Sequence, residues 1–238
     1  MSKASDLATK VLAPATGLLL FLQAALVVTG GAVRLTGSGL GCPTWPECTP
    51  GSYTPVPHQA EPQLNVWIEF GNRLLTFVLV IASAAVIIAV LKSKRKDLRV
   101  LAVGQFLGIF GQGILGGITV LTGLNPWIVG LHFVVSGVLI ATATTMFQRG
   151  LLSPLANKAK LAISLAWPTA VVGTIAVLFG IVVTGAGPHA GDIDTPRNGL
   201  DLEVWQHYHS YPGYLMLTLI TLQLFSQLRV DRSFSNPV

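Results

Sequence analysis

Charged residues are scarce in this sequence. Asp, Glu, Lys and Arg make up 11% of its 238 residues, whereas a soluble domain carries about 25%. Hydrophobic residues make up 51%. This composition excludes an ordinary soluble domain and predicts that most of the chain faces lipid. The net charge of +5 does not indicate nucleic-acid binding, because the basic residues lie beside apolar runs, as in the cytoplasmic loops of membrane proteins.

Cysteine is scarcer still. The two cysteines, Cys42 and Cys48, lie in one short loop rich in Gly and Pro. A structural metal site usually takes four ligands, so this pair by itself does not predict one. The two residues are either free thiols or a disulfide, and an oxidising compartment would favour the disulfide.

Long apolar runs are what the chain has in abundance. About 20 helical residues cross the ~30 Å hydrocarbon core at ~1.5 Å per residue. Runs close to this length occupy residues 15–33, 66–91, 100–121, 127–147, 161–184 and 203–224. We therefore expect an all-α membrane protein with six transmembrane helices, the first four of which form a four-helix bundle.

The basic residues predict the orientation of these spans. With the N-terminus in the cytoplasm, 12 of the 15 Lys and Arg residues lie on the cytoplasmic side, as the positive-inside rule requires. They are Lys3, Lys10, Lys92, Lys94, Arg95, Lys96, Arg99, Arg149, Lys158, Lys160, Arg229 and Arg232. Both termini are thus expected in the cytoplasm, and the cysteine loop on the outer face, where a disulfide persists.

Short strings recur in the two halves of the chain. VTGG at residues 28–31 is echoed by VTGA at 183–186, and VW at 66–67 recurs at 204–205. Their common order predicts two copies of one four-helix unit in the same orientation. We expect residues 1–150 to form the first bundle and 151–238 to form half of the second, because two complete copies would need eight spans and this chain ends after six.

Several polar groups lie inside the predicted spans, where ionisable residues are costly and usually face a bundle interior. Glu69, Asn72 and Arg73 share one helical face, since they are spaced i, i+3 and i+4. Asn72 and His132 each lie roughly 8–9 Å below the outer end of their helices. The second and fourth spans run in the same direction, so these two side chains can face each other across a core of the kind that holds haem or metals.

Structural alternatives exist for each of these residues. His132 could simply form a hydrogen bond to a neighbouring helix. Glu69 and Arg73 could form an interfacial ion pair, with Arg73 snorkelling outward. In the last span, His207 and His209 point about 200° apart, so at most one of them enters a core.

Four strings, in this order and at these topological positions, resemble the haem A synthase family over nearly the whole chain. They are GGAVRLTGSGLGCPTWPEC after the first span, EFGNR in the second, GGITVLTGLNPWIVGLH across the third and fourth, and VVTGAGPHAGD after the fifth. The resemblance implies a membrane enzyme that oxidises a ring methyl group of haem O to the formyl group of haem A. It also implies eight spans, with the substrate haem in the first half (residues 1–150 here) and a haem b cofactor in the second.

The resemblance also implies roles for individual residues. Glu69 matches the acidic residue of the family's Glu-x-x-His-Arg motif, a proposed catalytic group, and could serve as the proton acceptor of the oxidation. His132 matches a haem-ligand histidine of the fourth span. Cys42 and Cys48 match an outer-loop cysteine pair. His207, and less closely His209, matches the haem-iron ligand of the sixth span. Haem propionates need cations, and Arg34 and Arg73 lie near the outer boundary, where they could bind them.

Two departures from the family pattern stand out. Asn72 replaces the usual histidine of the second span, and an amide is a poor iron ligand. The substrate haem is then five-coordinate on His132, or Asn72 forms a hydrogen bond to water or haem. Nothing corresponds to spans 7 and 8, so we expect a fragment, a diverged copy, or a second bundle that another subunit completes.

The residues leave other functions open. An electron-transfer cytochrome b would also need intramembrane histidines, but in facing pairs and without Glu69. A thiol–quinone redox protein would usually need Cys-x-x-Cys and a second pair, and a transporter would need broken helices. The expected partners are haem O as substrate, membrane lipid, a haem O synthase and a second copy of the chain, and not nucleic acid.

Overall fold

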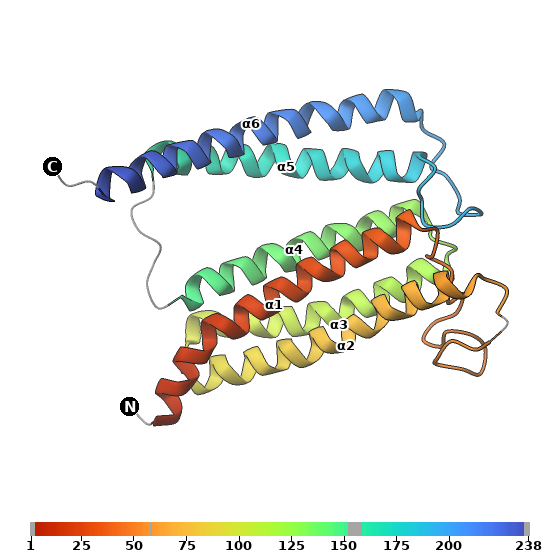
Figure 1. Ribbon diagram of the computed structural model, residues 1–238, viewed down its shortest axis with the longest axis horizontal. Helices are drawn as coiled ribbons and strands as arrows, with labels where there is room; N and C mark the ends of the chain where they lie inside the picture. The colour runs from red at the N-terminus through yellow and green to blue at the C-terminus, as the bar shows by residue number, and fades with distance from the viewer. Residues whose placement is uncertain (1–2, 58, 152–158, 236–238) are drawn as a thin grey trace. The chain divides into compact units, whose positions relative to one another are not determined.

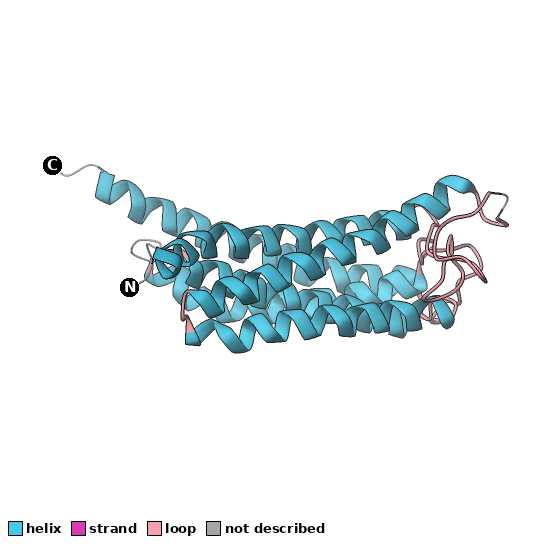
Figure 2. Cartoon of the chain, turned by 90° about the horizontal axis from the view of Figure 1, so that it is seen from below, coloured by secondary structure: helices cyan, strands magenta, loops and turns pink. Residues whose placement is uncertain are grey.

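The computed structural model describes residues 3–57, 59–151 and 159–235. Lys158, one of the basic residues counted for the orientation, lies outside this part of the chain. The described residues form six α-helices, a short 3₁₀ turn η1 (Lys96–Leu98) and no strand (Figures 1 and 2). The predicted all-α class is therefore confirmed. The helices are α1 (Lys3–Leu35), α2 (Gln63–Lys92), α3 (Arg99–Leu121), α4 (Pro126–Gly150), α5 (Lys160–Ala186) and α6 (Leu202–Ser235).

Each predicted apolar run lies in one of these helices. Within the described chain, α1 to α5 are long and apolar enough to cross a membrane. α6 has the length, at 34 residues, but not the same apolarity. Part of the reason is that α6 carries polar residues that contact α5 and the residue before it. Gln223 Nε2 donates to Thr169 Oγ1 of α5 at 2.8 Å, and Gln227 Oε1 accepts from Ala159 N, at the N-cap of α5, at 3.0 Å.

The chain divides into two compact units. The first contains α1 to α4 together with residues 188–197, and the second contains α5 and α6. In the first unit, α1 packs against α2 and α4, and α3 packs against the same two helices. α2 and α4 therefore occupy opposite corners of a four-helix bundle, as predicted from their common direction. We call the end that carries residues 36–62 and 122–125 the loop end (Figure 1).

The half of this bundle away from the loop end has a well-filled apolar core. Its buried members are Leu12, Leu19, Leu79, Ala82, Val86, Ala89, Val90, Leu98, Ala102, Ile109 and Met146. A polar network lies beside them: Gln23 Nε2 donates to Gln105 Oε1 at 2.9 Å, and Gln105 Nε2 donates to Thr142 Oγ1 at 2.6 Å. These bonds connect α1, α3 and α4 through groups that would be costly to bury without partners.

Between this core and the loop end, three of the four helices have a stretch without buried residues. No residue is buried between Glu69 and Leu79 on α2, between Ile109 and Gly117 on α3, or between Gly130 and Leu139 on α4.

The inward stripe of each helix changes character at this level. On α4, the stripe of Leu139, Ala143 and Met146 continues at heptad spacing to Ser136 and His132. On α1, the stripe of Leu19 and Gln23 continues to Gly30, where an added Cβ would meet no atom within 4 Å. Small and polar residues thus face the interior near the loop end.

The filled core should carry much of the stability of the first unit. Leu79 is 2% exposed, so Leu79→Ala should lower the free energy of unfolding by about 2–5 kcal/mol, through lost burial and a residual cavity. Thermal denaturation of the purified protein in detergent measures this loss of stability. The matched control is Ile81→Ala on the same helix, because Ile81 is 69% exposed and should cost little. Equal losses for the two variants would contradict this core.

Candidate functional site

The polar face of α2 holds the cysteine loop, the connection between α1 and α2 that carries Cys42 and Cys48. Glu69 is 5% exposed. Its Oε2 accepts the backbone N–H of Cys42 at 2.6 Å, and its Oε1 accepts from Arg73 Nε at 3.1 Å and from Arg73 Nη2 at 2.5 Å. The i, i+4 ion pair that the sequence suggested is present. It connects α2 to the cysteine loop, rather than lying free at the interface.

Arg73 binds the loop through the rest of its guanidinium group. Nη1 donates to Thr44 O at 3.0 Å and to Glu47 O at 3.3 Å, and Nη2 donates to Cys42 O at 2.6 Å. With the two bonds to Glu69, all five N–H donors of Arg73 are engaged. None remains for a propionate in this arrangement, so the structure does not support the propionate contact predicted for Arg73. It also does not snorkel away from the protein.

The cysteine loop is a closed unit on this anchor. Cys42 and Cys48 form a disulfide, and their residues are 0% and 1% exposed. Gly41 allows the loop to reach α2, because an added Cβ at Gly41 would lie 2.7 Å from Asn65 O. The disulfide therefore lies under the loop, covered by protein.

Asn72 points to α1, next to this anchor. Thr29 Oγ1 donates to Asn72 Oδ1 at 2.7 Å, and Thr29 Oγ1 also lies 3.1 Å from Leu26 O. An Asn side chain has two N–H donors as well as its oxygen, so at least one N–H of Asn72 is left for another group. Thr29 was not singled out in the sequence, although a polar residue inside an apolar span was a signal for it.

His132 lies across the bundle on α4 and contacts α3. Its ring lies beside Gly116, where an added Cβ would come 3.4 Å from His132 Cε1. Gln112 Nε2 donates to His132 O at 3.0 Å and to Ser136 Oγ at 2.5 Å. Two buried atoms of this group, His132 Nδ1 and Gln112 Oε1, have no hydrogen-bond partner among the described residues. The structural alternative for His132 was a hydrogen bond from its ring to a neighbouring helix. Nδ1 forms no such bond with the described residues.

Arg34 contacts the segment that groups with the first bundle from further along the chain. Its Nε donates to His189 O at 2.5 Å, and nearby Gly39 N donates to Gly191 O at 2.8 Å. Gly191 has φ +116°, which favours glycine, and it packs on Leu124. The two terminal amino groups of Arg34 form no hydrogen bond to the described residues, so they are available to an anion at the loop end.

The second unit positions both predicted histidines of α6. His207 is exposed, and its Nδ1 lies 2.6 Å from Glu203 O. His209 lies against Gly180 of α5, with its Nδ1 2.9 Å from Ala176 O. A carbonyl oxygen only accepts, so Nδ1 is the donor in both rings, and Nε2 takes no part in these hydrogen bonds. This is the arrangement that metal-ligating histidines use. The two rings point in different directions, as their spacing predicts.

The family of the chain follows from comparison with known proteins. The model of the family COX15-CtaA, described as cytochrome oxidase assembly protein, matches residues 15–192 of the 238. The chain is 29% identical to haem A synthase of Halalkalibacterium halodurans over 223 residues, which are 86% of this chain and 72% of that protein. It is 32% identical to haem A synthase of Geobacillus kaustophilus over 110 residues, and 36% identical to that of Listeria welshimeri over 118 residues. The chain belongs to the haem A synthase family.

The extent of these matches differs between relatives. The alignments to the Geobacillus and Listeria proteins cover 45% and 47% of this chain, and 32% and 36% of the relatives' length. No solved structure matches the chain. The resemblance seen in the sequence motifs is confirmed at the level of the family. The assignment of residues to roles remains a prediction.

The described residues fit a haem on chemical grounds. A buried imidazole nitrogen without a partner is present at His132, the inward stripes near the loop end pass to Gly30 and polar side chains, and Arg34 offers free N–H donors. No group of three or more His, Cys, Asp or Glu that could hold a bare metal ion occurs in the described part of the chain. A porphyrin, which brings four of its own nitrogen ligands, needs only one or two side chains from the protein.

The anchor on α2 should control access of reductants to the disulfide. Arg73→Ala leaves the buried Glu69 charge without its partner and the Cys42 and Thr44 carbonyls without their donor, a change that typically costs about 3–5 kcal/mol. We expect a water-soluble thiol to reduce the Cys42–Cys48 disulfide faster in this variant than in the unmodified chain. The rate is measured by alkylating the freed thiols and detecting them by mass spectrometry. Arg95→Ala is the matched control, because Arg95 pairs with Asp97 outside the loop end. An unchanged reduction rate for Arg73→Ala would refute the anchor.

Proposed function

We propose that this chain is a membrane-bound haem A synthase, an oxidoreductase that converts the methyl group of haem O to the formyl group of haem A for cytochrome oxidase assembly. The family match over residues 15–192 supports this. The single structural observation that carries it is the imidazole of His132, which lies in the stretch of α4 without buried residues and has a buried nitrogen with no partner among the described residues.

In this proposal His132 holds the iron of the substrate, haem O. The wide apolar macrocycle lies between the inward stripes of α1 to α4 near the loop end, where its burial is favourable. Asn72 lies on α2 and carries an amide rather than an imidazole, so it contributes an N–H donor instead of a second iron ligand. Thr29 fixes the direction of that amide.

Arg34 is the cation proposed for the haem propionates. Its terminal amino groups lie at the loop end, and Arg–carboxylate pairs are strong because they combine charge with two hydrogen bonds. Arg73, with its five donors engaged, contributes indirectly by holding the loop over this end of the bundle. The apolar ring would then lie within the membrane and its carboxylates near the boundary.

The first role of Glu69 is to hold the cysteine loop. Its two oxygens accept three N–H groups, so it can take a proton from the substrate only if one of these bonds breaks. Its role as catalytic proton acceptor stays a prediction. A haem b cofactor, when bound, would supply one-electron transfer. His207 and His209 are its candidate ligands, because each uses Nδ1 for a backbone carbonyl and leaves Nε2 for the iron.

The membrane arrangement is part of the proposal. We infer that both termini lie in the cytoplasm and that the disulfide loop lies on the outer face, because 12 of 15 basic residues then satisfy the positive-inside rule. A haem O synthase that delivers the substrate, and a second copy of the chain, are the proposed protein partners.

Analysis of extracted haems tests the activity. The full chain, purified from membranes supplied with haem O, should contain bound haem and yield haem A on chromatography. His132→Ala should lower haem A to roughly a tenth or less, because loss of an axial ligand removes both binding and orientation of the reacting group. The matched control is His189→Ala, since His189 is exposed and contributes its backbone carbonyl to Arg34.

The possible outcomes separate the competing functions. Bound haem that remains haem O, with reversible oxidation and reduction, would replace the enzyme with an electron-transfer cytochrome b. Absence of any bound haem would overturn both functions.

Labelling in intact cells tests the orientation. Ile193, which is 90% exposed, lies in the segment that contacts the loop end, whereas Lys94 is exposed at the opposite end of the bundle. Ile193→Cys should react with a membrane-impermeant maleimide, and Lys94→Cys should react only after the cells are opened. The native cysteines give no background, because they form a disulfide. The reverse pattern would invert the proposed topology.

A further inference from the structure

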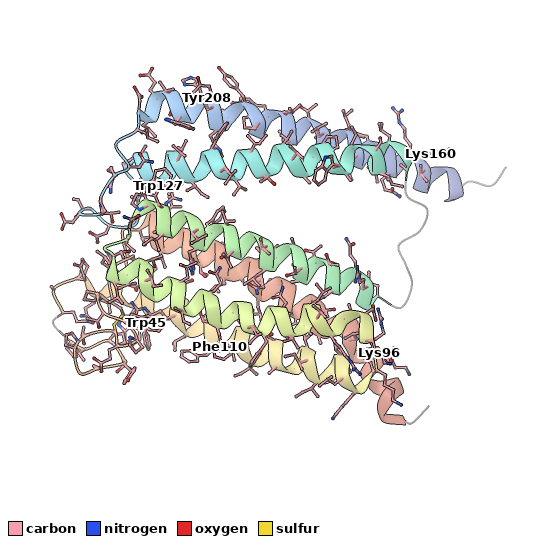
Figure 3. The ribbon with its side chains drawn as sticks, turned by 180° about the vertical axis from the view of Figure 1, so that it is seen from behind. Trp45, Lys96, Phe110, Trp127, Lys160 and Tyr208 are labelled. Atoms are coloured by element: carbon pink, nitrogen blue, oxygen red, sulfur yellow. A yellow bond between two sulfur atoms is a disulfide. The ribbon has the colours of Figure 1, made fainter. Side chains whose placement is uncertain are left out.

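An indole from the outer loop is seated on α3. Trp45 lies in the disulfide loop at the loop end of the bundle (Figure 3) and packs directly on Gly117. A Cβ added at Gly117 would lie 2.4 Å from Trp45 Cδ2 and 2.7 Å from Cε2. Real Cβ atoms do not approach other atoms this closely, so only glycine at this position accepts the indole as it lies.

The loop anchor fixes the backbone on both sides of this indole. Arg73 Nη1 donates to Thr44 O and to Glu47 O, which flank Trp45. Thr44 Oγ1 also donates to Glu47 O at 2.9 Å. The polar bonds from α2 and the disulfide thus converge on the short segment that carries Trp45. A segment held in this way has few alternative positions for its side chain.

Trp45 and His132 pack against adjacent residues of α3. Gly117 contacts the indole, and Gly116, the preceding residue of α3, contacts the His132 ring. Successive residues of a helix point about 100° apart, so the two rings lie on neighbouring sides of one turn of α3. Trp45 is nevertheless 40% exposed. One part of the side chain therefore stays exposed, while the indole packs on α3 one residue away from the contact of the His132 ring.

We propose that Trp45 is a positioning residue that closes the loop end of the bundle beside His132 and restricts the entry of water and small ligands to the substrate haem. This inference rests on the proposed function. Conversion of a methyl group to a formyl group removes four electrons and adds one oxygen atom, which water or dioxygen must supply. A large apolar side chain at this place limits how much of either reaches the reacting carbon, which restricts side reactions of the intermediates. Gly117 is then the residue that sets its closed position.

Ligand entry to the haem tests this closure without measuring product. The full chain is loaded with ferric haem O, and the rate of cyanide binding is followed by rapid-mixing absorbance. Trp45→Ala should accelerate binding roughly tenfold, as loss of a lid over a sequestered site does. Gly117→Ala should give a similar acceleration with Trp45 still present, because its new methyl group displaces the indole.

Two variants serve as matched controls. Gly111→Ala lies on the same helix, is exposed, and adds a methyl group that meets no atom within 4 Å, so its binding rate should equal that of the unmodified chain. Trp45→Phe should restore most of the slow binding that Trp45→Ala loses. Mass spectrometry establishes that the disulfide is intact in each variant, which separates closure by the indole from general loss of the loop.

A second measurement examines the contact between the Trp45 indole and Gly117. The fluorescence of Trp45, taken as the difference between the unmodified chain and Trp45→Phe, should be quenched more strongly by acrylamide in Gly117→Ala. Unchanged quenching, or unchanged cyanide rates in both Trp45→Ala and Gly117→Ala, would overturn the closure while leaving the haem site standing. Failure of the unmodified chain to bind haem O would overturn the proposed function, and the closure with it.

Discussion

The first bundle depends on one side chain that binds three backbone carbonyls of the cysteine loop. The guanidinium of Arg73 has five N–H donors in a fixed plane, and here each has an acceptor on Glu69 or on the backbone of the cysteine loop. Backbone carbonyls of an irregular loop need donors wherever water is excluded. By supplying them from α2, Arg73 allows a compact loop without regular structure to lie on the end of a membrane bundle.

Glu69 and Arg73, the two charged residues of this face of α2, therefore have a different role from the one that their residue types suggest. A carboxylate and an arginine in a span usually mark a site of ligand chemistry. Glu69 and Arg73 instead bind each other and the backbone of the cysteine loop. Of the predicted site residues in the first unit, Asn72, Arg34 and His132 keep polar atoms without a partner among the described residues, and these three are the ones proposed to bind the haem.

The bundle also divides its packing between its two ends. Away from the loop, buried aliphatic side chains and the Gln23–Gln105 pair hold the helices together. Near the loop, glycine and polar residues replace them on the same inward stripes. Stability can then come from one half while the other remains able to accept a flat ligand, since a fully packed interior leaves no room for one.

The sequence by itself determined the helices, the family and the face shared by Glu69, Asn72 and Arg73, because these follow from apolar run length, motif order and helical periodicity. It also showed that His207 and His209 point apart, for the same reason. Only the tertiary structure decided what each side chain meets: that Arg73 has no donor to spare, that Thr29 holds Asn72, and that Trp45 sits on Gly117. Those contacts join residues far apart in the chain, and no local pattern of a sequence records which loop carbonyl or which helix face lies within hydrogen-bonding or van der Waals distance.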